Sequence, residues 1–146
     1  MKAFKGIISD PEMLIVFIFQ FSSAMCRGVL VMVIPLFFFF FDLSLSRIGI
    51  IVSLNSISTG ILQNVSGKMA DNVHKNTLII IGGVISAVTL IGLPNLTTPL
   101  SLSVASVAFG VGHAFASPSL AAIAAARGKN FGSGRTMGLF NIAFSI

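Results

Sequence analysis

Residues 67–76, Gly-Lys-Met-Ala-Asp-Asn-Val-His-Lys-Asn, form the densest polar segment of a chain that is otherwise nearly all apolar. A long apolar run lies on each side of it, residues 48–66 before and residues 77–93 after. A short charged hairpin between two such runs is typical of a membrane surface, because charged side chains are costly inside the bilayer. The stretch therefore predicts two helices that cross a membrane and turn back at its face.

The composition also indicates an integral membrane protein. Of the 146 residues, 55% are hydrophobic and 9% are charged, whereas a soluble domain carries about a quarter charged residues. The net charge of +5 does not indicate nucleic acid binding, because the basic residues flank or interrupt apolar runs and form no single patch. Cys26 is the single cysteine, which excludes a disulfide framework and a zinc site. No metal and no cofactor are expected.

Five apolar runs predict an all-α integral membrane bundle in one N-terminal membrane domain, residues 1–146. The expected spans are residues 12–41, 48–66, 77–93, 99–126 and 136–146. About 20 helical residues cross the ~30 Å hydrocarbon core, so the first four runs are long enough or nearly so. The fifth would supply only ~15 Å of helix, and we therefore expect a truncated chain.

Local signals predict where two helices begin and where two are disturbed. Asp10 and Pro11 form an N-cap followed by proline at the first helical position, and Thr98 repeats this pattern with its following proline. Pro35 and Pro118 lie inside the first and fourth runs, where proline removes a backbone hydrogen-bond donor and is expected to kink the helix.

The basic residues predict the orientation in the membrane. The turns expected on the opposite side from the N-terminus contain only Arg47. Seven basic residues lie at the N-terminus, in residues 67–76 and in residues 127–135: Lys2, Lys5, Lys68, Lys75, Arg127, Lys129 and Arg135. By the positive-inside rule, the N-terminus is cytoplasmic. We expect a multi-pass protein of the plasma or inner membrane.

Arg27 is the one basic residue that this count leaves inside a span. Its side chain reaches ~6 Å, against the ~15 Å that separate it from either interface, and its insertion costs at least ~2.5 kcal/mol. Gln20, Ser23 and Arg27 recur at i, i+3 and i+7, which places them on one helical face. The stripe is a candidate solute pathway in which Arg27 binds an anionic or hydrogen-bond-accepting group. The alternative is a structural arginine that helix carbonyls or an acidic residue elsewhere satisfy.

His113 is the only ionisable residue of the fourth run. A histidine near neutral pH can shuttle a coupling proton, and the alternative is a simple hydrogen bond across helices. In the second run, Asn55, Gln63 and Asn64 are expected to form hydrogen bonds between helices. The same run carries small residues at spacings of three, four and seven, which places them on one helical face that is expected to allow close helix approach: Gly49, Ser53, Ser56, Gly60 and Gly67. Asp71 and Lys75 are four residues apart, which permits a local surface ion pair.

Residues 67–76 resemble the loop between the second and third transmembrane helices of major facilitator superfamily transporters. Three positions depart from that pattern: Asn72, His74 and Asn76. Five positions match it: Gly67, Met69, Ala70, Asp71 and Lys75.

The resemblance implies the incomplete N-terminal half of a bundle of twelve helices, in which the first and fourth helices line a central pathway. Arg27 and His113 would then both face that pathway. In the superfamily, the aspartate at the position of Asp71 helps to hold the cytoplasmic side closed. Ser106 and Ala125 stand where many proton-coupled exporters carry an arginine and an acidic residue, so that coupling device is absent.

The resemblance implies secondary active transport of a small solute by alternating access, driven by an ion gradient, with efflux as a candidate direction. The expected partners are the lipid bilayer, a small-molecule solute, a coupling ion (proton or sodium) and the missing C-terminal half. The alternatives are a non-transporting membrane scaffold or assembly subunit, an inactive gene remnant and a small homo-oligomeric carrier. An enzyme is not expected, because the sequence has no paired carboxylates, no metal-ligand cluster and no nucleophile beside a base.

Overall fold

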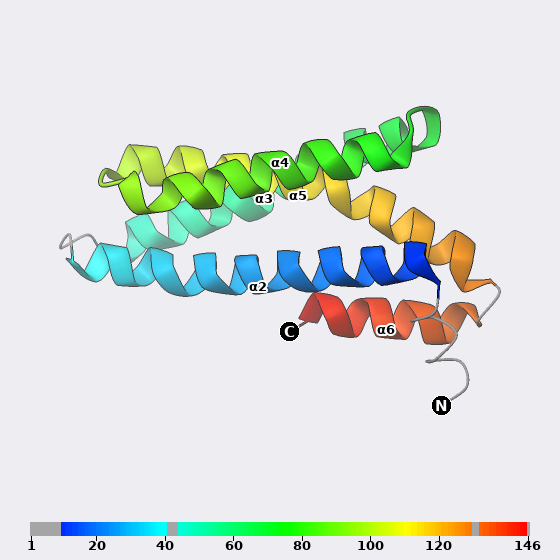
Figure 1. Cartoon of the computed structure of the whole chain (residues 1–146). Helices are drawn as coiled ribbons and strands as arrows, with labels where there is room; N and C mark the ends of the chain where they lie inside the picture. The colour runs from blue at the N-terminus through cyan, green and yellow to red at the C-terminus, as the bar shows by residue number, and fades with distance from the viewer. Residues whose placement is uncertain (1–9, 41–43, 130–131, 146) are drawn as a thin grey trace. The chain divides into compact units, whose positions relative to one another are not determined.

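The structure, a computed structural model, describes residues 10–40, 44–129 and 132–145. These residues are almost all helical and contain no strand, which confirms the predicted all-α class. The helices in chain order are α2 (Pro11–Phe40), α3 (Leu45–Asn72), α4 (Lys75–Gly92), the short 3₁₀ helix η1 (Leu93–Asn95), α5 (Pro99–Gly128) and α6 (Ser133–Ser145) (Figure 1). Lys2, Lys5 and Ile146 lie outside the described residues.

Four helices within the described part of the chain are long and apolar enough to cross a membrane. Their candidate spans are Pro11–Val33, Ser46–Asn72, Lys75–Asn95 and Pro99–Gly128. They correspond to the first four apolar runs. α6 has 13 residues, which is about 20 Å of helix.

The helix α3 continues beyond its apolar run and includes most of the polar stretch. It ends at Asn72, where the backbone N–H of Val73 donates to the carbonyl of Met69, and α4 begins at Lys75. The turn between the helices is therefore only Val73 and His74. Charged side chains are compatible with a helix that has left the hydrocarbon core. The polar stretch therefore marks the membrane surface and does not mark the end of the helix.

Both predicted helix starts have the expected caps. The Oδ1 atom of Asp10 accepts hydrogen bonds from the backbone N–H groups of Glu12 (3.0 Å) and Met13 (3.4 Å). At the start of α5, the Ser101 N–H donates to the Thr98 hydroxyl and the Thr98 N–H donates to the Ser101 hydroxyl, each at 3.2 Å. These side chains satisfy N–H groups that have no partner within the helix.

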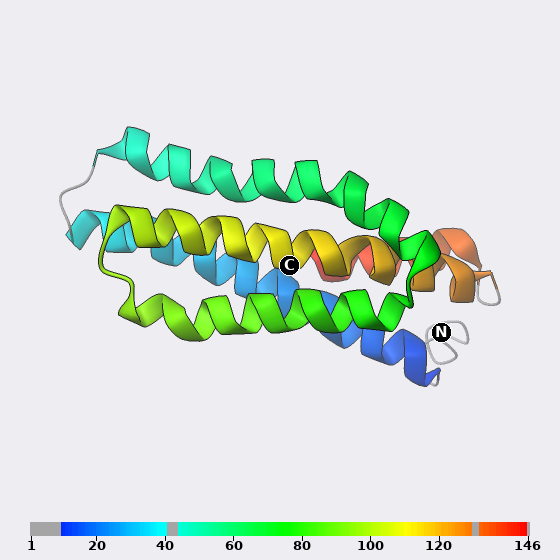
Figure 2. The same cartoon turned by 90° about the horizontal axis from the view of Figure 1, so that it is seen from above.

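The chain divides into two compact units, and both divisions fall inside helices. The first unit comprises the described parts of Met1–Gly28 and Leu120–Ile146, and the second comprises those of Val29–Ser119. Within the second unit, α5 as far as Ser119 lies between α3 and α4 (Figure 2). The single domain predicted for residues 1–146 stays a prediction.

Candidate functional site

The polar stripe predicted on the first membrane helix lies on α2, in the first unit. The Gln20 side chain is buried, with 1% of its surface exposed, while Ser23 and Arg27 are half-buried. The Nε2 atom of Gln20 has no hydrogen-bond partner among the described residues. A buried amide in that state is costly, and such groups in native proteins call for a specific explanation.

His113 lies on α5 in the second unit and is also buried, with 8% exposed. It therefore belongs to a different unit from Gln20, Ser23 and Arg27. The expectation that His113 and Arg27 face one pathway stays a prediction.

Side chains between α3 and α5 form a ladder of hydrogen bonds to backbone carbonyls. The Nδ2 group of Asn55 donates to the carbonyl of Ser106 at 2.9 Å, and the Ser106 hydroxyl donates to the carbonyl of Ile51 at 2.8 Å. One turn further, the Thr59 hydroxyl lies 3.1 Å from the carbonyl oxygen of Gly110 and 2.8 Å from the carbonyl oxygen of Asn55 in its own helix. The interhelical role predicted for Asn55 is thus confirmed, while Gln63 and Asn64 are exposed. Hydrogen bonds of this kind hold helices together in lipid, where apolar surface alone does not select a partner.

Glycines allow α5 to approach α3 and α4 closely. A Cβ atom added to Gly110 would lie 2.7 Å from the Asn55 carbonyl oxygen, and one added to Gly112 would lie 2.7 Å from the Gly82 carbonyl oxygen. Both distances are below those that real Cβ atoms show. The helix backbones therefore come together only because these side chains are absent.

The predicted small-residue face of α3 does not take part in this close packing. A Cβ atom added to Gly49, Gly60 or Gly67 would meet nothing within 4 Å, and Ser53 and Ser56 are exposed. The sequence suggested this face as the surface of close helix approach. Within the second unit, α3 instead contacts α5 through the face that carries its hydrogen-bonding side chains.

The five motif residues lie at the end of α3 and the start of α4. Ala70 is buried, Gly67 and Lys75 are half-buried, and Met69 and Asp71 are exposed. Both ion pairs recorded among the described residues involve Arg127, so Asp71 and Lys75 do not pair in this structure. The gating role that the resemblance implies for Asp71 stays a prediction.

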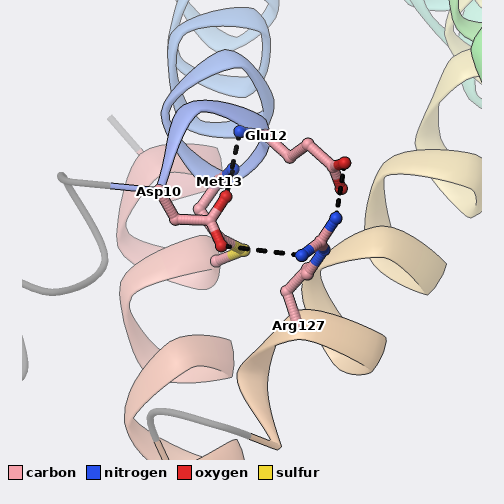
Figure 3. Close-up of polar contacts among 4 residues, drawn as sticks. All are labelled: Asp10, Glu12, Met13 and Arg127. Carbon is pink, nitrogen blue, oxygen red and sulfur yellow. Dashed lines mark hydrogen bonds and ion pairs between the residues drawn. The ribbon is translucent and has the colours of Figure 1, made fainter.

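An ion-pair cluster joins the start of α2 to the end of α5 in the first unit (Figure 3). The guanidinium of Arg127 lies 2.5 Å from Oε1 of Glu12 and 4.0 Å from Oδ2 of Asp10. The cluster places these two helix ends together, as expected if both lie at the same membrane face. The sequence gives one signal for this contact: acidic residues at the start of one helix and a basic residue at the end of another are complementary in charge.

No group of three His, Cys, Asp or Glu residues in the described part of the chain is placed to hold a metal ion. Arg27 and His113 lie well inside the candidate membrane spans, whereas Glu12, Arg47, Lys68, Asp71, Lys75 and Arg127 lie near the span ends. Ionisable groups well inside a span can recognise a solute or carry a proton.

The family profile described as Major Facilitator Superfamily matches residues 1–146. The chain belongs to the Major Facilitator Superfamily. This superfamily consists of multi-pass membrane transporters and not generally of enzymes, and its membership confirms the resemblance seen in residues 67–76.

A curated superfamily protein of Methanocaldococcus jannaschii, named as an uncharacterised MFS-type transporter, is 26% identical over 130 residues. The match covers 89% of this chain and 33% of the relative, so the chain spans about a third of the relative's length. No solved structure matches the chain.

Proposed function

We propose that this superfamily chain acts in secondary active transport, moving a small solute across the membrane by alternating access. The transport path is formed together with a second helical half, in keeping with the longer relative. An ion gradient supplies the energy, and the protein lies in the plasma or inner membrane with its N-terminus in the cytoplasm.

The observation that carries this proposal is the polar face of α2. Gln20, Ser23 and Arg27 share one side of a membrane-crossing helix, and the buried amide nitrogen of Gln20 has no hydrogen-bond partner among the described residues. Ionisable residues at this depth are rare and are usually functional. A solute with a carboxylate or another hydrogen-bond acceptor would bind Arg27 and accept a hydrogen bond from Gln20.

His113 is the proposed site of proton coupling. It is buried in α5, and an imidazole can change charge near neutral pH. Proton coupling predicts that transport depends on His113 and on the proton gradient. Sodium coupling predicts that transport depends on sodium and persists when His113 is replaced by glutamine.

Cysteine accessibility of the complete transporter in membrane vesicles tests the pathway. In a Cys26→Ala background, Ser23→Cys should react with a membrane-impermeant maleimide, because a water-filled path ionises the thiol and admits the reagent. Met25→Cys is the matched control at nearly the same depth, because Met25 is 54% exposed on the surface of this chain and would face lipid. Labelling at Ser23→Cys alone supports the pathway, whereas no labelling from either membrane side would favour the non-transporting scaffold.

A further inference from the structure

Pro118 interrupts the backbone hydrogen bonds of α5 at a buried position. In an α-helix, the carbonyl of residue 114 accepts from the N–H of residue 118, and proline has no N–H. Ala114 is fully buried, and α5 nevertheless continues without a break from Pro99 to Gly128. A buried carbonyl without a donor is costly in a membrane, so another group is needed there.

A serine on the neighbouring helix supplies that group. The hydroxyl oxygen of Ser66, on α3, lies 2.5 Å from the carbonyl oxygen of Ala114 and 3.2 Å from the carbonyl oxygen of Gln63 in its own helix. The hydroxyl has one proton, and the nearer acceptor is Ala114. Ser66 is itself 1% exposed, so water does not compete for this bond.

The bond differs from the other contacts between α3 and α5. The carbonyl of Ser106, which accepts from Asn55, can also accept from the backbone N–H four residues later in α5. The Thr59 hydroxyl lies nearer to the Asn55 carbonyl oxygen of its own helix (2.8 Å) than to the Gly110 carbonyl oxygen (3.1 Å). The carbonyl of Ala114 lacks that backbone donor because of Pro118. Ser66 therefore replaces a backbone hydrogen bond, whereas Asn55 adds to an existing one.

The bond joins two candidate functional segments of the second unit, the motif stretch and the part of α5 around His113. Ser66 immediately precedes the motif stretch, residues 67–76, and Ala114 immediately follows His113. We propose that Ser66 is a positioning residue, which replaces the hydrogen-bond donor missing at Pro118 and so ties the motif stretch to the segment of α5 that carries His113. The link to transport depends on the function proposed above, but the replaced hydrogen bond does not.

A double-mutant cycle on the complete protein in detergent tests the replaced hydrogen bond. Ser66→Ala is expected to lower the midpoint of thermal unfolding by about 3–8 °C. Pro118→Ala restores the backbone N–H donor. In that background, Ser66→Ala should shift the midpoint of thermal unfolding by no more than about 1 °C. Thr59→Val is the matched control, because its effect should be the same in both backgrounds. Equal effects of Ser66→Ala in the two backgrounds would overturn the proposal.

Folding failures also give a defined answer. If Ser66→Ala does not fold alone, recovery of folded protein in the Ser66→Ala, Pro118→Ala double variant supports the proposal, and no recovery contradicts it. If Pro118→Ala does not fold, the series Ser66→Thr, Ser66→Cys and Ser66→Ala replaces the cycle. Stability should fall in that order, because the thiol is a weaker donor than the hydroxyl and alanine has no donor. Equal stability across the series would overturn the proposal.

A change in accessibility at position 113 tests the positioning role. In a Cys26→Ala background, Ser66→Ala should change the maleimide labelling rate of His113→Cys by about 5-fold, the lower range of typical coupling between sites. Ser66→Thr should restore the rate, and labelling at Ser103→Cys, far along α5, should be unaffected. An unchanged rate at His113→Cys contradicts the positioning role.

If the unfolding cycle shows coupling while the α2 pathway cysteine, Ser23→Cys, is never labelled, the proposed transport function fails and the replaced hydrogen bond stands.

Discussion

At the scale of single residues, the absence of a side chain decides how closely the helices pack. Gly82 on α4 faces α5, where an added Cβ would lie 2.9 Å from the backbone nitrogen of Ala116 and 3.0 Å from its Cβ. Backbone atoms cannot rotate away as a flexible side chain can. Any larger residue must therefore push α4 and α5 apart.

Gly82→Ala is accordingly expected to destabilise the protein by about 1–3 kcal/mol, the usual cost of overpacking. Gly60→Ala is the matched control, because a Cβ there meets nothing within 4 Å and alanine improves helix propensity by up to ~1 kcal/mol. Thermal unfolding in detergent measures both. Equal destabilisation by the two changes would show that α4 and α5 are not in close contact.

One asparagine provides a second prediction at this scale. Asn55→Ala removes the hydrogen bond to the Ser106 carbonyl and should cost about 0.6–1.7 kcal/mol, as measured for hydrogen bonds between membrane helices. Asn64→Ala, on the exposed side of the same helix, should change stability by less than about 0.5 kcal/mol. The prediction fails if the two substitutions have the same effect on the unfolding midpoint.

At the scale of helices, an ion-pair cluster joins two ends that are far apart in the sequence. Arg127 adds a positive charge at the C-terminal end of α5, and Glu12 adds a negative charge in the first turn of α2. Each charge also has the sign that the dipole of its own helix favours. The pair therefore supports both helices and their contact in the first unit.

Neutralising the pair tests this contact. Glu12→Gln and Arg127→Gln should each lower the unfolding midpoint at low salt, and the double variant should lose less than the sum of the two because they share one interaction. The loss caused by each single substitution should shrink at high salt, since exposed charges are screened. Arg135→Gln, an exposed arginine of α6, serves as the control for general charge effects. Additive losses at low salt would argue against the ion pair.

At the scale of the whole molecule, the alternation of helices and turns predicts a defined orientation. In a Cys26→Ala background, His74→Cys in the turn after α3 and Ser133→Cys at the start of α6 should be labelled only from the cytoplasmic side. Asn95→Cys, at the end of η1, should be labelled only from the opposite side. Labelling of intact cells and of inverted vesicles with an impermeant maleimide measures this. The reverse pattern would show that the positive-inside rule gives the wrong orientation here.

The fold class, the helices long enough to cross a membrane, their caps and the family could all be predicted from the amino-acid sequence. Apolar length, an Asp10 cap and the motif in residues 67–76 are properties of one segment each, so they can be recognised without knowing any partner. Asn55 could also be predicted as a hydrogen-bonding residue, because an amide inside a membrane helix needs an acceptor.

Which helix faces and which residues meet could be seen only in the folded arrangement. The small residues of α3 suggested one face for close approach, whereas the close contacts involve Gly82, Gly110 and Gly112. The Arg127 ion pairs and the bond from Ser66 to Ala114 likewise join segments far apart in the sequence. The physical reason is that lipid is as apolar as the helix surfaces, so hydrophobic pattern does not select a partner. Selection depends on shape and hydrogen bonding between two helices at once, and these exist only after the helices have come together.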